Sequence, residues 1–254
     1  MTNLAYGQFC GLARALEVVG EPWALLVVRD LVAGPKSPDD LRRGLPRMPR
    51  AVLTARLGEL AAAGIIRRAR PAAGSPAGYE LTEYGSELEE IILQLGRWGA
   101  RTLGGPRREE VITTDSMLTA LRSTFRPDAA RRLKVSYELR LGEIVIHARV
   151  EDGTLTVGEG PLPDADLVIE AGPALKAVMA GEISPREAIE TGSVRLRTGN
   201  VGLTKDPGLL AWFAEIFHIA PAPRSRPSDR PRPAGAAVPA QPRAGNPVPA
   251  GAGR

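Results

Sequence analysis

Residues 41–70 read LRRGLPRMPRAVLTARLGELAAAGIIRRAR, and their pattern indicates the fold of the first part of the chain. Leu53, Leu57 and Leu60 recur at helical spacing and predict a helix from Pro49 to about Ala63, which stops at Gly64. The opposite face of this helix carries small, nearly uncharged side chains, so it can approach another molecule closely. These side chains belong to Ala51, Thr54, Ala55 and Gly58.

The flanking residues predict a second helix and a hairpin. Ser37 and Pro38 mark the start of a helix that ends at Gly44, because serine caps helices and proline fits the first helical position. Residues 65–70 and 79–81 predict two short strands joined by a flexible tip at 71–78. Two helices joined by a turn and followed by a basic hairpin are typical of a domain that reads DNA.

Residues 41–70 contain eight arginines and a single acid, Glu59. If the helix from Pro49 enters the major groove of double-stranded DNA, its rim is expected to contact base edges, because arginine pairs bidentately with guanine. We expect base contacts from Arg47, Arg50 and Thr54, phosphate contacts from Arg42, Arg43 and Arg56, and backbone or minor-groove contacts from Arg67, Arg68 and Arg70. The alternative interpretation is a solvated basic face.

Charge divides the chain. Residues 1–108 carry 15 basic and 11 acidic side chains, residues 109–220 carry 12 and 17, and residues 221–254 carry 6 and 1. We predict a DNA-binding domain at 1–103, a linker at 104–113, a second domain at 114–220 and a disordered Pro/Ala/Arg tail at 221–254. Apolar alternation in the second domain predicts an α+β fold with a five-stranded sheet.

Several classes of protein are excluded or disfavoured. Cys10 is the only cysteine, so no intrachain disulfide can form. No signal peptide or bilayer-spanning run is visible, so we expect a cytoplasmic protein without a membrane partner. His147 and His218 are the only histidines, which argues against a metal site, and no nucleophile–base pair is visible. We therefore expect neither enzymatic activity nor a cofactor.

Three stretches of the first hundred residues resemble the HxlR family of bacterial winged-helix regulators. The first, Tyr6–Pro35, has a cysteine near the N-terminus and a Gly-x-x-Trp motif. The second, Leu41–Arg68, contains Leu-Thr-x-Arg-Leu-x-x-Leu, and the third, Tyr79–Gly99, contains Tyr-x-Leu-Thr-x-x-Gly. The resemblance implies a homodimer formed through the N-terminal and last helices. The apolar residues of those helices are Leu12, Leu16, Leu88, Ile91, Ile92, Leu95 and Trp98. One departure is visible, because Lys36 is followed by Ser37-Pro38 where the family has an aromatic residue.

Residues 114–219 resemble a sterol-carrier-protein-type domain. The resemblance rests on Ala165–Ile169, on Ala174–Asn200 with Gly181, Ala188 and Gly192, and on a closing apolar helix. It implies an apolar pocket for a small-molecule effector, whereas the simpler interpretation is that the same side chains fill the core. The candidate lining residues are Phe125, Leu175, Val178, Met179, Ile189, Trp212, Phe213 and Phe217.

Cys10 precedes the first predicted helix and has two interpretations. It is either a small buried side chain or a redox sensor, since a helix N-terminus lowers the pKa of a thiol and the HxlR resemblance includes thiol-sensing members. A homodimeric, sequence-specific transcriptional regulator that responds to an apolar molecule or to thiol oxidation explains both halves of the chain. The alternative is a lipid or small-molecule carrier with an accessory DNA-binding domain.

Overall fold

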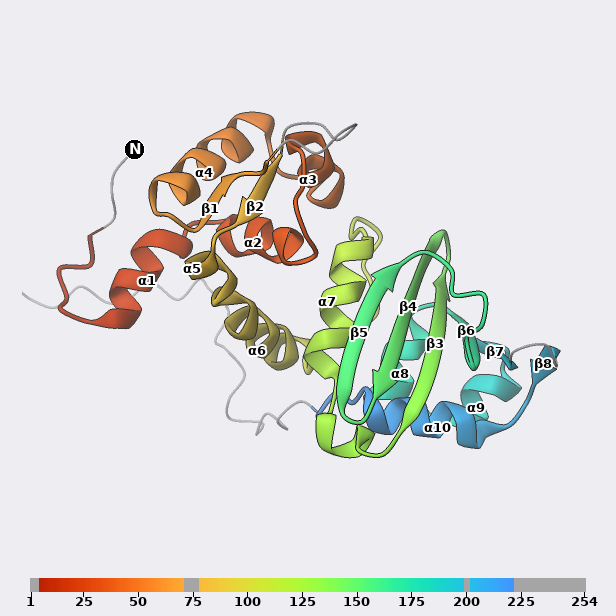
Figure 1. The fold of residues 1–254 in the computed structure, drawn as a ribbon. Coiled ribbons are helices and arrows are strands. Elements are labelled where there is room, and N and C mark those ends of the chain that lie inside the picture. Colours follow the sequence, from red (N-terminus) through yellow and green to blue (C-terminus); the bar gives the residue numbers. More distant parts are fainter. Residues whose placement is uncertain (1–4, 71–77, 199–201, 222–254) are drawn as a thin grey trace, which may run out of the picture. The chain divides into compact units, whose positions relative to one another are not determined.

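The computed structural model of the protein describes residues 5–70, 78–198 and 202–221 (Figure 1). Residues 71–77 of the hairpin tip predicted at 71–78, and residues 222–254 of the tail predicted at 221–254, lie outside the described residues. These described residues form one compact unit that contains two separate hydrophobic cores. One core draws its buried side chains from Val19 to Ile92 and the other from Leu118 to Ile219. The two cores are consistent with the predicted domains at 1–103 and 114–220, joined by a linker at 104–113; the domain boundaries stay a prediction.

The first part of the chain is a winged helix-turn-helix, as predicted. Its elements are α1 (Gly11–Val19), α2 (Ala24–Val32), α3 (Pro38–Gly44), α4 (Arg50–Ala62), β1 (Ile66–Arg68), β2 (Tyr79–Leu81), α5 (Glu83–Ser86) and α6 (Leu88–Ala100). The helical segment that follows β2 consists of two helices, α5 and α6, separated at Glu87. Thr82 caps only the first of them, because its Oγ1 accepts a hydrogen bond from the Gly85 N–H at 2.9 Å.

The hairpin pairs antiparallel, with Ile66 opposite Leu81 and Arg68 opposite Tyr79. Lys36 adds a bridge on the other side of β2, where it exchanges two backbone hydrogen bonds of 2.9 and 2.8 Å with Tyr79. The sequence pattern did not predict this bridge, because a single paired residue has no periodicity. It ties the segment before α3 to the base of the wing.

The second part of the chain is built from a mixed sheet and helices. It contains α7 (Thr114–Thr124), a 3-10 helix η1 (Pro127–Ala130), β3 (Lys134–Leu141), β4 (Ile144–Glu151), β5 (Thr154–Glu159), β6 (Leu167–Ala171), α8 (Ala174–Met179), α9 (Pro185–Glu190), β7 (Val194–Thr198), β8 (Gly202–Thr204) and α10 (Pro207–Ile216). The strand order is β5-β4-β3-β6-β7-β8, and β3 and β6 are the parallel pair. The prediction of five strands was wrong by one, because β8 is too short to show alternation.

The helices of the second part pack on one face of this sheet (Figure 1). Inward-facing side chains such as Leu139, Ile146 and Ile169 are almost completely buried, whereas Arg149 and Arg195 on the other face are exposed. The centre of the core is aromatic, with Phe213 stacked 4.7 Å from Phe217 and edge-on to Tyr137 at 5.2 Å. Among the described residues, none of the helices is long and apolar enough to cross a bilayer.

Candidate nucleic-acid interface

Helix α3 begins at a capping box formed by Ser37 and Asp40. The Asp40 N–H donates to Ser37 Oγ at 3.1 Å, and the Ser37 N–H donates to Asp40 Oδ2 at 2.9 Å. Hydrogen bonds from the Ser37 hydroxyl and N–H hold the pKa of the Asp40 carboxyl below its ordinary value. The Ser37-Pro38 pair, where the sequence departs from the HxlR pattern that it resembles, therefore provides the cap that starts the helix.

Helix α4 turns its leucines inward and its small residues outward, as predicted. Leu53, Leu57 and Leu60 are between 1% and 3% exposed. On the opposite face Ala51, Thr54 and Gly58 are exposed, and the Thr54 hydroxyl donates to the Arg50 carbonyl at 3.1 Å. The outward face can therefore approach a partner without desolvating a charge.

The arginines around α3 and α4 are largely exposed, and two of them are held by one acid. Arg42 donates to Asp39 at 2.9 Å, and Arg50 lies 3.9 Å from the same carboxylate. Arg43 pairs with Asp40 and keeps 75% of its side chain exposed. Arg47, in the turn between the helices, is exposed and makes no side-chain hydrogen bond or ion pair within the described ranges. Such exposed pairs exchange easily for phosphate contacts, because each contributes only about 0–1 kcal/mol.

Arg56 differs from the other arginines of this region. Its side chain is only 14% exposed and pairs with Glu59 at 2.5 Å and Glu21 at 3.7 Å. Its Nε is buried with no hydrogen-bond partner in the described part of the chain. The structure therefore gives no support to the expectation that Arg56 contacts phosphate, since that contact would require it to leave both acids.

The hairpin presents its arginines in two ways. Arg67 pairs with Glu80 on the neighbouring strand at 2.8 Å and is 65% exposed. The guanidinium carbon of Arg68 lies 4.5 Å from the centre of the Tyr79 ring, a cation–π contact. Arg70 is exposed at the last described position before the hairpin tip.

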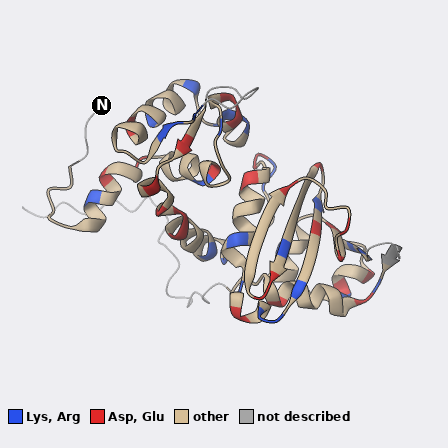
Figure 2. Cartoon of the chain, in the orientation of Figure 1, with Lys and Arg blue, Asp and Glu red and all other residues tan. Residues whose placement is uncertain are grey.

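These elements enclose an open hollow of about 370 Å³ between α3, α4 and the hairpin. It is lined by Pro38, Asp39, Arg42, Arg50, Leu53, Thr54, Leu57, Arg68 and Tyr79. Figure 2 shows basic residues along α4 and the hairpin strand beside it, with acidic residues on α3. The structure thus brings together four residues that were predicted from the sequence to contact DNA, namely Arg42, Arg50, Thr54 and Arg68. The hollow also contains Asp39 and Tyr79, which were not predicted.

Cys10 is exposed at the N-cap position of α1, so the interpretation as a small buried side chain is wrong. The nearby backbone N–H groups of Ala13 and Leu12 lower the pKa of its thiol, and the small effect of burial opposes them, although no hydrogen bond to the sulfur is formed at this N-cap. The neighbouring Arg14 pairs with Glu17 at 2.7 Å. No group of three or more His, Cys, Asp or Glu residues in the described ranges is placed to hold a metal ion.

The predicted dimer residues fall into two sets. Leu12 and Leu16 on α1 and Ile91, Leu95 and Trp98 on α6 are between 41% and 71% exposed. Ile92 is instead 7% exposed in the winged-helix core, and Leu88 packs against the same core. The helical period explains the division, because positions 91, 95 and 98 share the outer face of α6 while positions 88 and 92 share the inner one.

The predicted pocket residues lie mostly within the second core. Phe125, Leu175, Val178, Met179, Phe213 and Phe217 are at most 8% exposed, and Ile189 is half-buried against them. Trp212 lies on the outer side of α10 and is 61% exposed.

Comparison with known proteins places the first part of the chain in a family. The HxlR model, an HxlR-like helix-turn-helix, matches residues 18–105. The uncharacterized HTH-type transcriptional regulator YtcD of Bacillus subtilis (strain 168) is 40% identical over 86 residues, which are 34% of this chain and 68% of YtcD. The uncharacterized regulator Rv3095 of Mycobacterium tuberculosis (strain ATCC 25618 / H37Rv) is 38% identical over 97 residues, 37% of this chain and 60% of Rv3095.

Among solved structures, the redox regulator HypR in its oxidized form is 33% identical, with a TM-score of 0.34 over 37% of this chain and 99% of HypR. The reduced form of YodB from B. subtilis is 26% identical, with a TM-score of 0.33 over 37% of this chain and 95% of YodB. The sequence matches and the winged-helix geometry agree, and the chain belongs to the HxlR-like helix-turn-helix family of transcriptional regulators.

Proposed function

We propose that this chain is a cytoplasmic, sequence-specific DNA-binding regulator, with α4 in the major groove and the hairpin beside it. The observation that carries the proposal is the uncharged outer face of α4, bordered by the exposed Arg47 and Arg50 and by the hollow that contains Arg42 and Arg68. Arg47, Arg50 and Thr54 are assigned to base edges, and Arg42, Arg43, Arg67, Arg68 and Arg70 to phosphates or the minor groove. Arg56 is assigned to holding α4 in place.

Salt titration of binding to a selected DNA duplex tests this assignment. A dimer that neutralises roughly 6–10 phosphates should lose about 10³–10⁵ in affinity between 50 and 200 mM salt. Arg50→Ala should weaken binding, and Arg186→Ala is the matched control, because both side chains are about three-quarters exposed and Arg186 lies on α9. A flat salt response, or equal effects of the two variants, would contradict the proposal.

The regulator is proposed to act as a homodimer. Ile91, Leu95 and Trp98 form an exposed apolar stripe on α6, and Leu12 and Leu16 form another on α1. Exposed apolar stripes of this kind mark protein interfaces. A symmetric dimer would also place two copies of α4 to read two half-sites of DNA.

Residues 114–220 are proposed to form a sterol-carrier-like domain that binds an apolar effector. The mixed sheet with helices packed on one face supports this proposal, as does the apolar helix α10 that closes the core. A ligand would have to separate the stacked rings of Phe213 and Phe217 or enter beside Met179. A thermal-shift screen with fatty acids and sterols tests the idea, and the absence of any stabilising lipophile would count against it.

Cys10 is a second candidate for effector input, because its thiol is exposed and its pKa is lowered. A lowered pKa increases the fraction of reactive thiolate at neutral pH. We expect an oxidant such as diamide to change DNA affinity in the native chain and to have no effect on Cys10→Ser. Identical responses of the two proteins would remove Cys10 from the proposal.

A further inference from the structure

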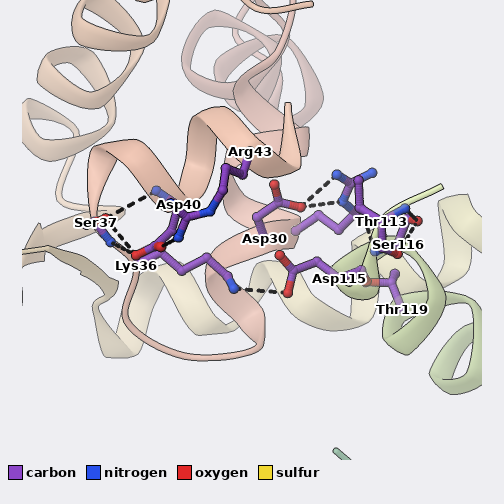
Figure 3. Close-up of polar contacts among 10 residues, drawn as sticks. Asp30, Lys36, Ser37, Asp40, Arg43, Thr113, Asp115, Ser116 and Thr119 are labelled. Atoms are coloured by element: carbon purple, nitrogen blue, oxygen red, sulfur yellow. Dashed lines mark hydrogen bonds and ion pairs between the residues drawn. The ribbon is translucent and has the colours of Figure 1, made fainter. Parts of the chain in front are cut away.

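Helix α7, the first element after the predicted linker, contacts the winged helix through Asp115. A capping box of Thr113 and Ser116 fixes the first turn of α7, with reciprocal hydrogen bonds of 3.1 and 3.3 Å (Figure 3). Asp115 Oδ1 lies 3.0 Å from Lys36 Nζ, and the two side chains are 13% and 21% exposed. This pair is more buried than an ordinary surface pair, so salt screens it less.

Lys36 is the residue through which such a contact reaches the DNA-facing surface. Its N–H donates to the Tyr79 carbonyl at 2.9 Å, and its carbonyl accepts from the Tyr79 N–H at 2.8 Å. Tyr79 carries the cation–π contact with Arg68 and lines the hollow between α3, α4 and the hairpin. The next residue, Ser37, caps α3. A displacement of Lys36 would therefore move the base of the wing and the start of α3 together.

The last residue of α3 lies near the same carboxylate. A Cβ placed on Gly44, the last residue of α3, would lie 2.5 Å from Asp30 Oδ2 and 3.8 Å from Asp115 Oδ2. Asp30 is fully buried on α2, and its Oδ2 has no hydrogen-bond partner within the described ranges. Its Oδ1 accepts from Arg29 Nε at 2.8 Å. Asp115 thus pairs with Lys36, just before α3, and its carboxylate lies near Gly44, the last residue of α3.

Helix α7 also belongs to the second core and is tied to α6. Leu118, Leu121 and the adjoining Phe125 are buried among the residues of the sheet. Arg122 Nη1 lies 2.6 Å from Glu89 Oε1, and Arg97 Nε donates to the Ser123 carbonyl at 2.7 Å. A rearrangement of the second core therefore cannot move α7 without disturbing its contacts with the winged helix.

We propose that Asp115 is a coupling residue through which residues 114–220 set the geometry of α3 and the wing, and hence the DNA affinity. The ion pair between Asp115 and Lys36 is called the Asp115 clamp. The intact clamp holds the segment around Lys36 in order before DNA binds. Without the clamp, that segment must be ordered during binding, and the lost conformational entropy lowers the DNA affinity. This proposal rests on the proposed DNA-binding function and adds the route by which the second part of the chain regulates it.

Asp115→Asn and Lys36→Gln in the full-length chain test the clamp from its two sides. Hydrogen exchange in DNA-free protein is the first measurement, and we expect at least about fivefold faster exchange at the amides of Lys36 and Tyr79. The second is affinity for a duplex selected by the native protein from a random library, which should fall by about 5- to 50-fold. The double variant should lose no more than either single variant, since both remove one contact.

Glu151→Gln is the matched control, because Glu151 pairs with Lys134 at 2.9 Å on the sheet and far from α3 in the chain. It should leave both measurements unchanged. Unchanged exchange in Asp115→Asn and Lys36→Gln overturns the clamp, and so does faster exchange without a loss of DNA affinity. If the native protein selects no DNA, the proposed function fails, and the exchange measurement still decides whether the clamp orders α3 and the wing.

Discussion

The guanidinium carbon of Arg68 lies 4.5 Å from the centre of the Tyr79 ring, directly across the two strands of the hairpin. The contact holds one arginine of the wing at the edge of the hollow formed with α3 and α4. Because the same tyrosine pairs its backbone with Lys36, a single residue organises the wing and the segment that leads into α3.

Replacing Tyr79 with leucine should remove this organisation while it preserves an apolar side chain in the strand. We expect a coupling free energy of about 0.5–1 kcal/mol between Tyr79→Leu and Arg68→Ala in unfolding, the usual size of an exposed cation–π contact. Chemical denaturation of the two single variants and the double variant measures it. Tyr84→Leu, at a tyrosine that is 63% exposed, is the control and should show no coupling to Arg68→Ala.

Asp39→Asn should strengthen binding to DNA of any sequence. Asp39 lies among the arginines of the hollow, pairs with Arg42 at 2.9 Å and approaches Arg50 at 3.9 Å, so it competes with phosphates for both. We expect up to about fivefold tighter binding, because an exposed ion pair contributes about 0–1 kcal/mol. Fluorescence anisotropy with specific and scrambled duplexes measures the effect.

Asp128→Asn is the control for Asp39→Asn, because Asp128 forms an ion pair of the same i, i+3 spacing with Arg131, at 2.8 Å, in the second part of the chain. It should leave the affinity unchanged. If Asp39→Asn instead changes the affinity for the specific duplex and not for the scrambled one, the prediction is contradicted. That result would indicate that the Asp39 carboxylate accepts a hydrogen bond from a cytosine amino group.

Trp98→Ser should weaken self-association, since Trp98 is the most exposed member of the apolar stripe on α6. A buried tryptophan at the centre of an interface commonly contributes about 2 kcal/mol or more, so the dimer dissociation constant should rise roughly 30-fold or more. Sedimentation equilibrium distinguishes a species of 27.0 kDa from one of twice that mass. Trp212→Ser removes an equally prominent tryptophan from α10 and should leave the native assembly unchanged, so equal effects of the two variants would contradict the proposed interface.

Asp30→Asn should change the pH dependence of folding. Burial raises the pKa of the Asp30 carboxyl, while the charge and hydrogen bonds of Arg29 oppose the shift; Asp115 adds to it and Lys36 opposes it. When the pKa is higher in the folded state than in the unfolded state, the carboxyl contributes most to stability at pH values below its pKa in the unfolded chain. That contribution is lost as the pH rises through the pKa of the folded state. As pH rises above about 4, the usual pKa of an aspartate in an unfolded chain, the variant should therefore gain stability relative to the native chain. Urea unfolding at several pH values checks this, and a constant difference in free energy of unfolding would show that Asp30 titrates normally.

Much of the winged helix could be predicted from local sequence. The Ser37-Pro38 start of α3 and the leucine repeat of α4 depend on residues within two turns of each other, and the structure confirms both. The candidate site was predictable to the extent that it depends on the same helices, so Arg42, Arg50, Thr54 and Arg68 were nominated and lie together. The break between α5 and α6 was not predictable, because Glu87, which separates them, keeps helical backbone angles and is not a helix-breaking residue.

The helix-turn-helix, the identity of its basic residues and the distribution of charge along the chain follow from local sequence, because periodicity, caps and composition are properties of neighbouring residues. What each charge does depends on the folded structure. It placed Arg56 against Glu21 and Glu59, brought Asp39 between two arginines and joined Lys36 to Asp115. The physical reason is that the availability of an arginine depends on burial and on acids from other elements, and neither is set until the chain has folded.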